Sequence, residues 1–241
     1  ANDRFITGSA ASATALATGY KTTIGVISMD PSKTRNYKTI AEMAKEAGMK
    51  VGILSSVSID HATPACFYAH QPSRSLYYQI DLDLANSGFD YFAGGGLRQK
   101  GRGENDPDAL DVAREKGYKV VGTRSGFKSL SPADGKVIAY NEILAGSDSL
   151  PYELDRDYSD ISLAEFTRKG IEMLDNENGF FMMVEGGKID WACHANDAAA
   201  SIYDTLAFDD AVKEAIDFYN DHPDETLIVV TGDHECGGMT L

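Results

Sequence analysis

Apolar runs alternate along this chain with amphipathic segments, a pattern that favours a parallel β-sheet covered by helices. Five apolar runs are predicted to be strands: residues 50–56, 89–95, 118–122, 179–186 and 226–234. Helical periodicity covers residues 36–48, 162–175 and about 194–220. The apolar stripes of these three helices are assigned to the core: Ile40, Met43, Ala44 and Ala47, then Leu163, Phe166, Ile171 and Leu174, then Ile202, Leu206, Val212, Ile216 and Tyr219. The predicted fold class is therefore α/β.

The expected organisation is one domain over residues 1–241. A length of 241 residues suits a single α/β domain with its own hydrophobic core. Residues 98–160 are less regular and rich in Gly, Asp, Ser and Pro, so we expect a loop-rich peripheral insertion there. Three glycines at 94–96 end a predicted strand, and we interpret them as a tight turn because no phosphate-binding loop signature follows.

The chain is strongly acidic. It has 37 acidic and 22 basic residues and a net charge of −15, which disfavours binding to nucleic acid or to anionic membranes. A phosphate-bearing substrate would therefore need local positive charge from metal ions or arginine. No stretch has the roughly 18 apolar residues of a transmembrane helix, and this chain shows no signal peptide. The cysteines, Cys66, Cys193 and Cys236, suggest neither a zinc ribbon nor a disulfide framework and are interpreted as small buried residues.

Polar clusters follow three of the predicted strands directly. SSVSIDHATPA follows residues 50–54, EGGKIDWACH follows FFMMV, and GDHE follows TLIVVT. In an open α/β sheet, ligands bind beyond the carboxyl ends of the strands. We therefore expect the three clusters to converge on one edge of the sheet.

The second and third clusters contain paired metal-ligand residue types. Asp190 and His194 have i, i+4 spacing, which puts a carboxylate and an imidazole on one helical face, a combination that suits zinc. For this pair alone, a capping aspartate and a surface histidine are the alternative. Asp233 and His234 are adjacent at a predicted strand end, where a loop can turn both toward one site. Glu185, at another strand end, adds a third carboxylate.

The segment TGSAASATALATG, residues 7–19, places a hydroxyl among small residues. If Ser9 begins a helix over 9–18, free backbone N–H groups and the positive end of the helix dipole face whatever binds there. Metal coordination would then activate the Ser9 hydroxyl as a nucleophile. The alternative is that Ser9 is simply the N-cap of that helix.

Together these segments resemble the alkaline phosphatase family. TGSAASATALATGYKT is similar to its nucleophile segment, DHATPACFYAHQPSR to its H-A-T-P stretch with a downstream arginine, and VEGGKIDWACHAND and VVTGDHECGG to its main metal-ligand segments. The four motifs occur in family order over most of the chain. The resemblance implies a three-layer αβα sandwich, two zinc ions, one magnesium ion, and hydrolysis of phosphate monoesters through a phosphoserine.

The resemblance also implies residue roles. Ser9 would be the nucleophile, and Arg74 would bind two phosphate oxygens. Asp190 and His194 would be ligands of the first zinc, Asp233 and His234 of the second, and Thr63 and Glu185 of the magnesium. His61 and Trp191 stand at positions that vary across the family and tune the third metal site and the phosphate pocket.

The sequence departs from the family pattern in two places. Family members usually have aspartate before the nucleophile, where it steadies the arginine, whereas this chain has Gly8. An aspartate-bearing strand before the nucleophile and a histidine beyond the Asp233–His234 pair have no counterpart. The chain thus resembles an internal fragment of the catalytic domain, truncated at both ends, and we expect weak or absent activity from it. The resemblance further implies a periplasmic or secreted protein and a homodimer, for which the sequence identifies no surface.

Other readings stay open. Sulfatases, phosphodiesterases and cofactor-independent phosphoglycerate mutases share the broad fold, although SAASA lacks the arginine of a sulfatase motif and the other two classes lack H-A-T-P combined with Arg74. In a different class, the chain would be a non-catalytic metal- or phosphate-binding module. A purely structural α/β domain leaves the three strand-end clusters unexplained.

Overall fold

The core of the molecule is a five-stranded parallel sheet. The computed structural model describes residues 1–238, and every strand pairing it contains is parallel. The strand order is β3-β4-β2-β1-β5, with bounds β1 Lys50–Ser55, β2 Tyr91–Gly94, β3 Lys119–Val121, β4 Val137–Tyr140 and β5 Phe180–Glu185. Four of the five predicted strands are therefore confirmed.

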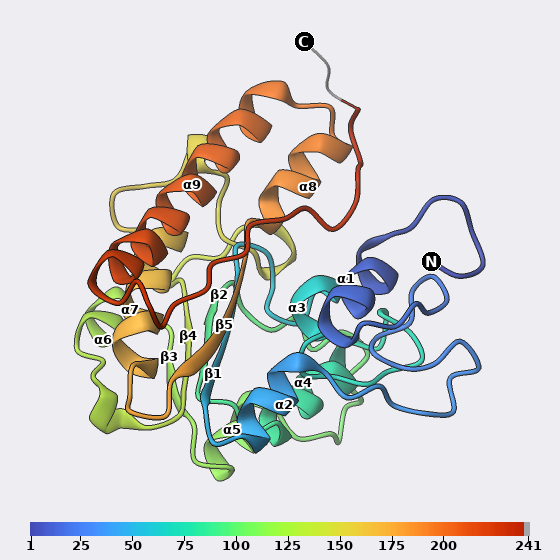
Figure 1. The fold of residues 1–241 in the computed structure, drawn as a ribbon, viewed down its shortest axis with the longest axis horizontal. Coiled ribbons are helices and arrows are strands. Elements are labelled where there is room, and N and C mark those ends of the chain that lie inside the picture. Colours follow the sequence, from blue (N-terminus) through green and yellow to red (C-terminus); the bar gives the residue numbers. More distant parts are fainter. Residues whose placement is uncertain (239–241) are drawn as a thin grey trace.

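Helices cover both faces of this sheet, as Figure 1 shows. Alternate strand residues point to opposite faces, so Val51 and Ile53 of β1 lie in one apolar cluster and Leu54 lies in another. The first cluster includes residues of α1, α2, α3, α4 and α5, and the second includes residues of α7. Two cores separated by one sheet make a three-layer αβα sandwich, which confirms the predicted fold class.

The helices have the following bounds: α1 Ser9–Thr18, α2 Ile40–Glu46, α3 Ala62–Ala65, α4 Tyr77–Asn86, α5 Ala109–Glu115, α6 Arg124–Lys128, α7 Leu163–Leu174, α8 Gly187–His194 and α9 Ala198–Asp221. Short 3₁₀ turns occur at Pro132–Asp134, Gly146–Asp148 and Glu153–Asp155. None of the helices in residues 1–238 has the length and apolar character of a membrane span.

Residues 98–160 are more regular than expected. They contain α5, β3, α6 and β4, and the two strands form one side of the sheet. The strand β4 has no counterpart in the sequence prediction, because its run VIAY is only four residues long. The segment also has irregular stretches, but its strands extend the sheet that supports the site.

The predicted strand over 226–234 is wrong. These residues form neither helix nor strand, and Leu227, Val229 and Val230 are exposed. A strand needs a hydrogen-bonding neighbour, and within residues 1–238 this segment has no strand pairing. An apolar run alone cannot supply that partner.

The predicted core stripes are only partly correct. Leu163, Phe166 and Leu174 of α7 are buried. In α9 the large residues Ile202, Leu206, Ile216 and Tyr219 are exposed, whereas Ala200, Ser201, Asp204 and Ala211 are buried. In α2, Ile40 and Met43 are likewise exposed while Ala41 is buried. Helices that pack closely through small residues turn their larger apolar residues outward.

Candidate active site

The candidate site lies at the carboxyl ends of β1 and β5. Ser55 and Glu185, the last residues of these strands, are paired in the register of the sheet, and the Ser55 hydroxyl donates to the Glu185 carboxylate. The N-terminus of α1, the helix α8 and the segment after α9 meet at this edge (Figure 1). The predicted convergence of strand-end clusters therefore holds for β1 and β5, and the third cluster reaches the same edge as an irregular segment.

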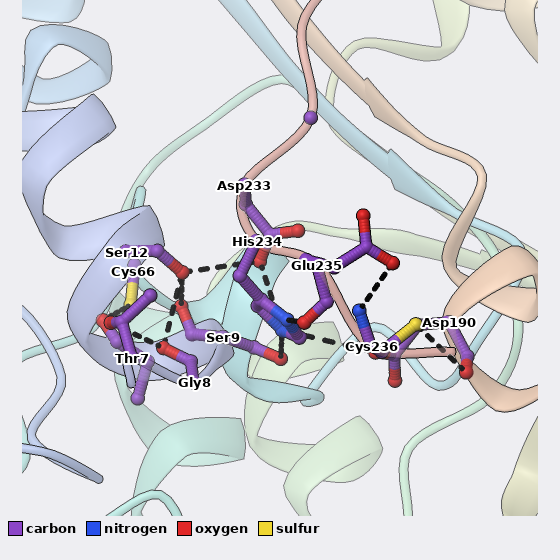
Figure 2. Close-up of polar contacts among 12 residues, drawn as sticks. Thr7, Gly8, Ser9, Ser12, Cys66, Asp190, Asp233, His234, Glu235 and Cys236 are labelled. Atoms are coloured by element: carbon purple, nitrogen blue, oxygen red, sulfur yellow. Dashed lines mark hydrogen bonds and ion pairs between the residues drawn. The ribbon is translucent and has the colours of Figure 1, made fainter. Parts of the chain in front are cut away.

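Ser9 is the first helical residue of α1, and Gly8 is its N-cap, with an extended backbone and no side-chain cap. The N-cap alternative for Ser9 is therefore wrong. The Ser9 hydroxyl lies 3.0 Å from Nε2 of His234, across 225 residues of sequence. One turn further along α1, the Ser12 hydroxyl donates to a carboxylate oxygen of Asp233 at 3.3 Å (Figure 2). Asp233 and His234 of the GDHE cluster thus both contact α1.

The tautomer of His234 follows from its second nitrogen. Nδ1 lies 2.9 Å from the carbonyl oxygen of Glu235, which can only accept a hydrogen bond. In a neutral imidazole Nδ1 therefore bears the proton, and Nε2 presents its lone pair to the Ser9 hydroxyl. The same lone pair is the one a metal ion requires.

Asp190 and His194 lie together on α8, as their spacing predicts. Oδ1 of Asp190 is 3.3 Å from Nε2 of His194 and 3.8 Å from Nε2 of His234. This oxygen is buried and has no hydrogen-bond partner within the described residues. Asp190 thus bridges the two predicted Asp–His sets, although the His194 side chain is 62% exposed.

Glu185 brings a third carboxylate to the same edge. Burial raises its pKa to about 7, and the charges of Asp233 and Asp190 add to that rise, whereas hydrogen bonds from Ser55 and Thr63 oppose it. Thr63, in α3, is buried beside it. Three carboxylates that face one another without a cation repel, and this repulsion favours a bound positive charge at this place.

Arg74 is hydrogen-bonded to a histidine. Its Nη2 donates to Nε2 of His61 at 2.9 Å, so the imidazole is neutral at that nitrogen. Burial, together with the positive charges of Arg74 and Arg98, lowers the pKa of His61 to about 3. The Trp191 ring meets the His61 ring edge-on, with 6.0 Å between centroids. Arg74 therefore has a packed, neutral hydrogen-bond partner.

Sequence reasoning missed Ser12, Ser55 and Lys188. The Lys188 side chain is buried, with Nζ 3.6 Å from the centre of the Tyr152 ring and 4.8 Å from that of Trp191. Lys188 comes two residues before Asp190 in the second cluster, and this position could have indicated that it lies at the site. A lysine is usually interpreted as an exposed surface residue, however. Ser12 follows Ser9 by one helical turn, but its contact with Asp233 joins distant parts of the chain and has no local signal.

The candidate metal ligands are arranged so that two of them at a time fit one metal ion. Ligands about 2.0–2.1 Å from a tetrahedral zinc lie roughly 3.3–3.4 Å apart, and Asp190 and His194 are separated by 3.3 Å. That same Asp190 oxygen has no hydrogen-bond partner among the described residues, and Nε2 of His234, 3.8 Å from it, is a further candidate ligand atom. Within residues 1–238, however, no three His, Cys, Asp or Glu side chains are arranged to hold one ion together.

The fold and site define the class of this protein: an α/β sandwich in which a helix-borne serine faces paired carboxylate and imidazole donors at the carboxyl edge of the sheet. The chain belongs to the alkaline phosphatase family, whose sequence profile matches residues 1–241.

Individual relatives agree. Alkaline phosphatase 4 of Bacillus subtilis is 36% identical over 246 residues, which cover 99% of this chain and 51% of that protein. The cold-active alkaline phosphatase of Shewanella sp. superposes with a TM-score of 0.82 at 35% identity, covering 92% of this chain and 53% of that one. A TAB5 alkaline phosphatase variant with magnesium in its M3 site gives a TM-score of 0.77 at 31% identity, over 90% and 61% of the two chains. The chain spans about half the length of the curated relatives it matches.

Proposed function

We propose that this chain provides the nucleophile and metal-ligand segments of an alkaline phosphatase, which hydrolyses phosphate monoesters through a phosphoserine at Ser9. The observation on which this rests is the 3.0 Å contact between the Ser9 hydroxyl and His234, because it joins the first helix to the Asp–His sets. A serine that served only as a helix cap would have no reason to meet a histidine 225 residues away.

In the proposed reaction, the Ser9 oxygen forms a bond to phosphorus while the ester P–O bond breaks and the alcohol leaves. Water then displaces the serine oxygen and releases inorganic phosphate. Arg74 binds the non-bridging oxygens through its planar guanidinium, and His61, which packs against Trp191, holds that guanidinium in place. The first amides of α1, which lack intrahelical partners, face the incoming anion.

Asp190 and His194 would hold one zinc ion, Asp233 and His234 a second, and Thr63 and Glu185 a magnesium ion. Metal ions bound there would neutralise the three carboxylates and stabilise negative charge on the attacking and leaving oxygens. Few of these residues would contact the leaving alcohol, so broad specificity is expected. Export to the periplasm or the medium, and dimerisation, stay predictions from the family resemblance.

The test is to trap the phosphoserine. The protein is incubated with zinc, magnesium and a radiolabelled phosphate monoester, quenched in acid and digested, and the labelled peptide is mapped. Label is expected on the peptide that contains Ser9, with none in Ser9→Ala and undiminished labelling in Thr18→Ala, which removes a hydroxyl at the far end of the same helix. Turnover of p-nitrophenyl phosphate should fall about a thousandfold or more in Ser9→Ala. Label on another residue would refute the assignment.

A second candidate is a non-catalytic metal-binding module. It is favoured by the 3.3 Å separation of Asp190 and His194, a pair that could hold an ion whether or not Ser9 is phosphorylated. Stoichiometric zinc binding with no label trapped at Ser9 would select this function.

A further inference from the structure

Two of the three cysteines lie side by side where the segment after α9 returns to α8. Cys193 is in the last turn of α8, and Cys236 follows His234 by two residues. The Cys236 thiol lies 3.8 Å from the carbonyl oxygen of Asp190, one helical turn before Cys193 (Figure 2). Cys236 therefore lies against the last turns of α8, the helix that contains Cys193.

Gly237 permits this close approach. A Cβ atom at residue 237 would lie 2.9 Å from the carbonyl oxygen of Cys193 and 3.1 Å from its Cβ. A larger residue would push the segment away from α8, and only glycine avoids this. Disulfide bonds join residues whose Cα atoms are about 4–7 Å apart, and the residue next to Cys236 lies in direct contact with Cys193.

The third cysteine has different surroundings. Cys66 is fully buried, and its thiol donates to the carbonyl oxygen of Ala10 at 3.2 Å. Cys193 and Cys236 are only partly buried. An oxidant in solution therefore reaches the pair and not Cys66, which makes Cys66 an internal reference.

We propose that Cys193 and Cys236 form a disulfide bond that fastens residues 233–238 to α8. The bond would link the segment that bears Asp233 and His234 to the helix that bears Asp190 and His194. Residues 226–238 contain neither helix nor strand, so this covalent link would be the firmest restraint on their position. It would keep the Asp233–His234 pair at a fixed position relative to the Asp190–His194 pair.

The oxidation requires an acceptor for two electrons, and a small disulfide such as oxidised glutathione serves. One cysteine thiolate attacks the glutathione disulfide, forms a mixed disulfide and releases one reduced glutathione. The other cysteine thiolate then attacks the protein sulfur of that mixed disulfide and releases the second glutathione. The protein loses two thiol protons and two electrons, and one glutathione disulfide becomes two thiols.

The test counts thiols in the whole chain, which has three cysteines. The protein is equilibrated with oxidised glutathione and EDTA, denatured in acid, and alkylated, and its peptides are mapped without reduction. One alkylated cysteine, Cys66, and a cross-linked peptide pair containing Cys193 and Cys236 are expected, against three alkylated cysteines after reduction. Three alkylated cysteines in the oxidised sample, or a cross-link that includes Cys66, would overturn the proposal.

One variant tests whether both thiols are needed for the bond, and another tests whether the two cysteines must lie close together. Cys193→Ser should leave Cys236 as a stable mixed disulfide with glutathione, because the resolving thiol is missing. Gly237→Val should lower the yield of the cross-link, since the added side chain displaces Cys236 from α8. Gly232→Val serves as the control, because a Cβ at residue 232 meets no atom within 4 Å and its backbone is not left-handed. Equal yields in the two glycine variants would contradict the geometry.

A structural readout completes the test. Limited proteolysis within residues 222–238 should be severalfold slower in the oxidised than in the reduced wild type, and the difference should vanish in Cys193→Ser. These measurements involve no turnover, so their outcome is independent of the proposed hydrolysis. Identical cleavage rates in oxidised and reduced protein would show that the bond does not fasten the segment.

Discussion

Replacing Gly8 by aspartate tests how the arginine of the site is held. Gly8 has φ −138° and ψ 169°, which any residue adopts, and a Cβ added there would meet no atom within 4 Å. Aspartate therefore fits without strain. It would give α1 a side-chain cap that the helix now lacks, and it would restore the residue type that steadies the arginine in the family pattern.

Two separable effects are expected. A capping side chain in place of glycine stabilises a helix by only a few tenths of a kcal/mol, and a negative charge at the N-terminus adds about 0.3–1 kcal/mol. The second effect concerns Arg74, which now donates to the neutral His61. A carboxylate partner forms a stronger hydrogen bond with arginine. At a partly exposed position this is worth about 0.5–1 kcal/mol, or roughly a two- to fivefold tighter binding of phosphate.

The assay is inhibition of p-nitrophenyl phosphate hydrolysis by inorganic phosphate. Direct phosphate titration, monitored through the fluorescence of Trp191, the single tryptophan of the chain, replaces it if turnover is slow. The matched control is Gly8→Asn, which caps α1 without a charge. Both variants should unfold at higher urea concentration, and only Gly8→Asp should bind phosphate more tightly. An unchanged phosphate constant in Gly8→Asp, or equal tightening in Gly8→Asn, would refute the reasoning.

Three further predictions concern stability and the site's surroundings. Gly94→Ala should destabilise the fold by about 3 kcal/mol or more, because φ is +122° and the new Cβ would lie 1.9 Å from the Ser55 carbonyl oxygen. Gly88→Ala, at φ +69° with open space around it, should cost only about 1 kcal/mol in urea unfolding. Burial opposes protonation of His70, but hydrogen bonds to Glu42 and to the Ser28 carbonyl outweigh it and raise the pKa above 6.5. Its stabilisation is thus complete below pH 6.5 and is lost as pH rises through the raised pKa; unfolding curves of His70→Gln should lack this loss. Burial lowers the pKa of Lys188 below 10.5, so Trp191 fluorescence should change at alkaline pH in a step that Lys188→Met lacks.

Two of the strands that the sequence predicted correctly, β1 and β2, are buried on both faces. In β1, Val51, Ile53 and Leu54 are all fully buried, and such a run has no other stable arrangement in water. The order of the strands was not predictable, since nothing local in Phe180–Glu185 indicates that β5 pairs with β1. The strand prediction for residues 226–234 was wrong for the same reason. The composition of this run suits a strand, but whether it pairs depends on residues far away in the sequence.

The site was predictable in its residue types and less so in its contacts. Helical spacing placed Asp190 beside His194 correctly, because i and i+4 share a helix face. Spacing said nothing of Asp190 meeting His234, or of Arg74 donating to His61, since these contacts join separate elements. The exposure of Ile202 and Leu206 on α9 also depends on what packs against that helix, and α7, α8 and the turn at Glu153–Asp155 all do so.

The contact between Ser9 and His234 spans nearly the whole chain. Contacts with such sequence separation carry the largest loop-closure entropy and form late in folding. The sheet can therefore be complete while the catalytic edge is still open, and the closing segment belongs to the least protected part of the molecule. Metal ions or phosphate that bind only the closed form would shift this local equilibrium by mass action. Ligand concentration, as much as the amino-acid sequence, would then set the fraction of molecules with an assembled site.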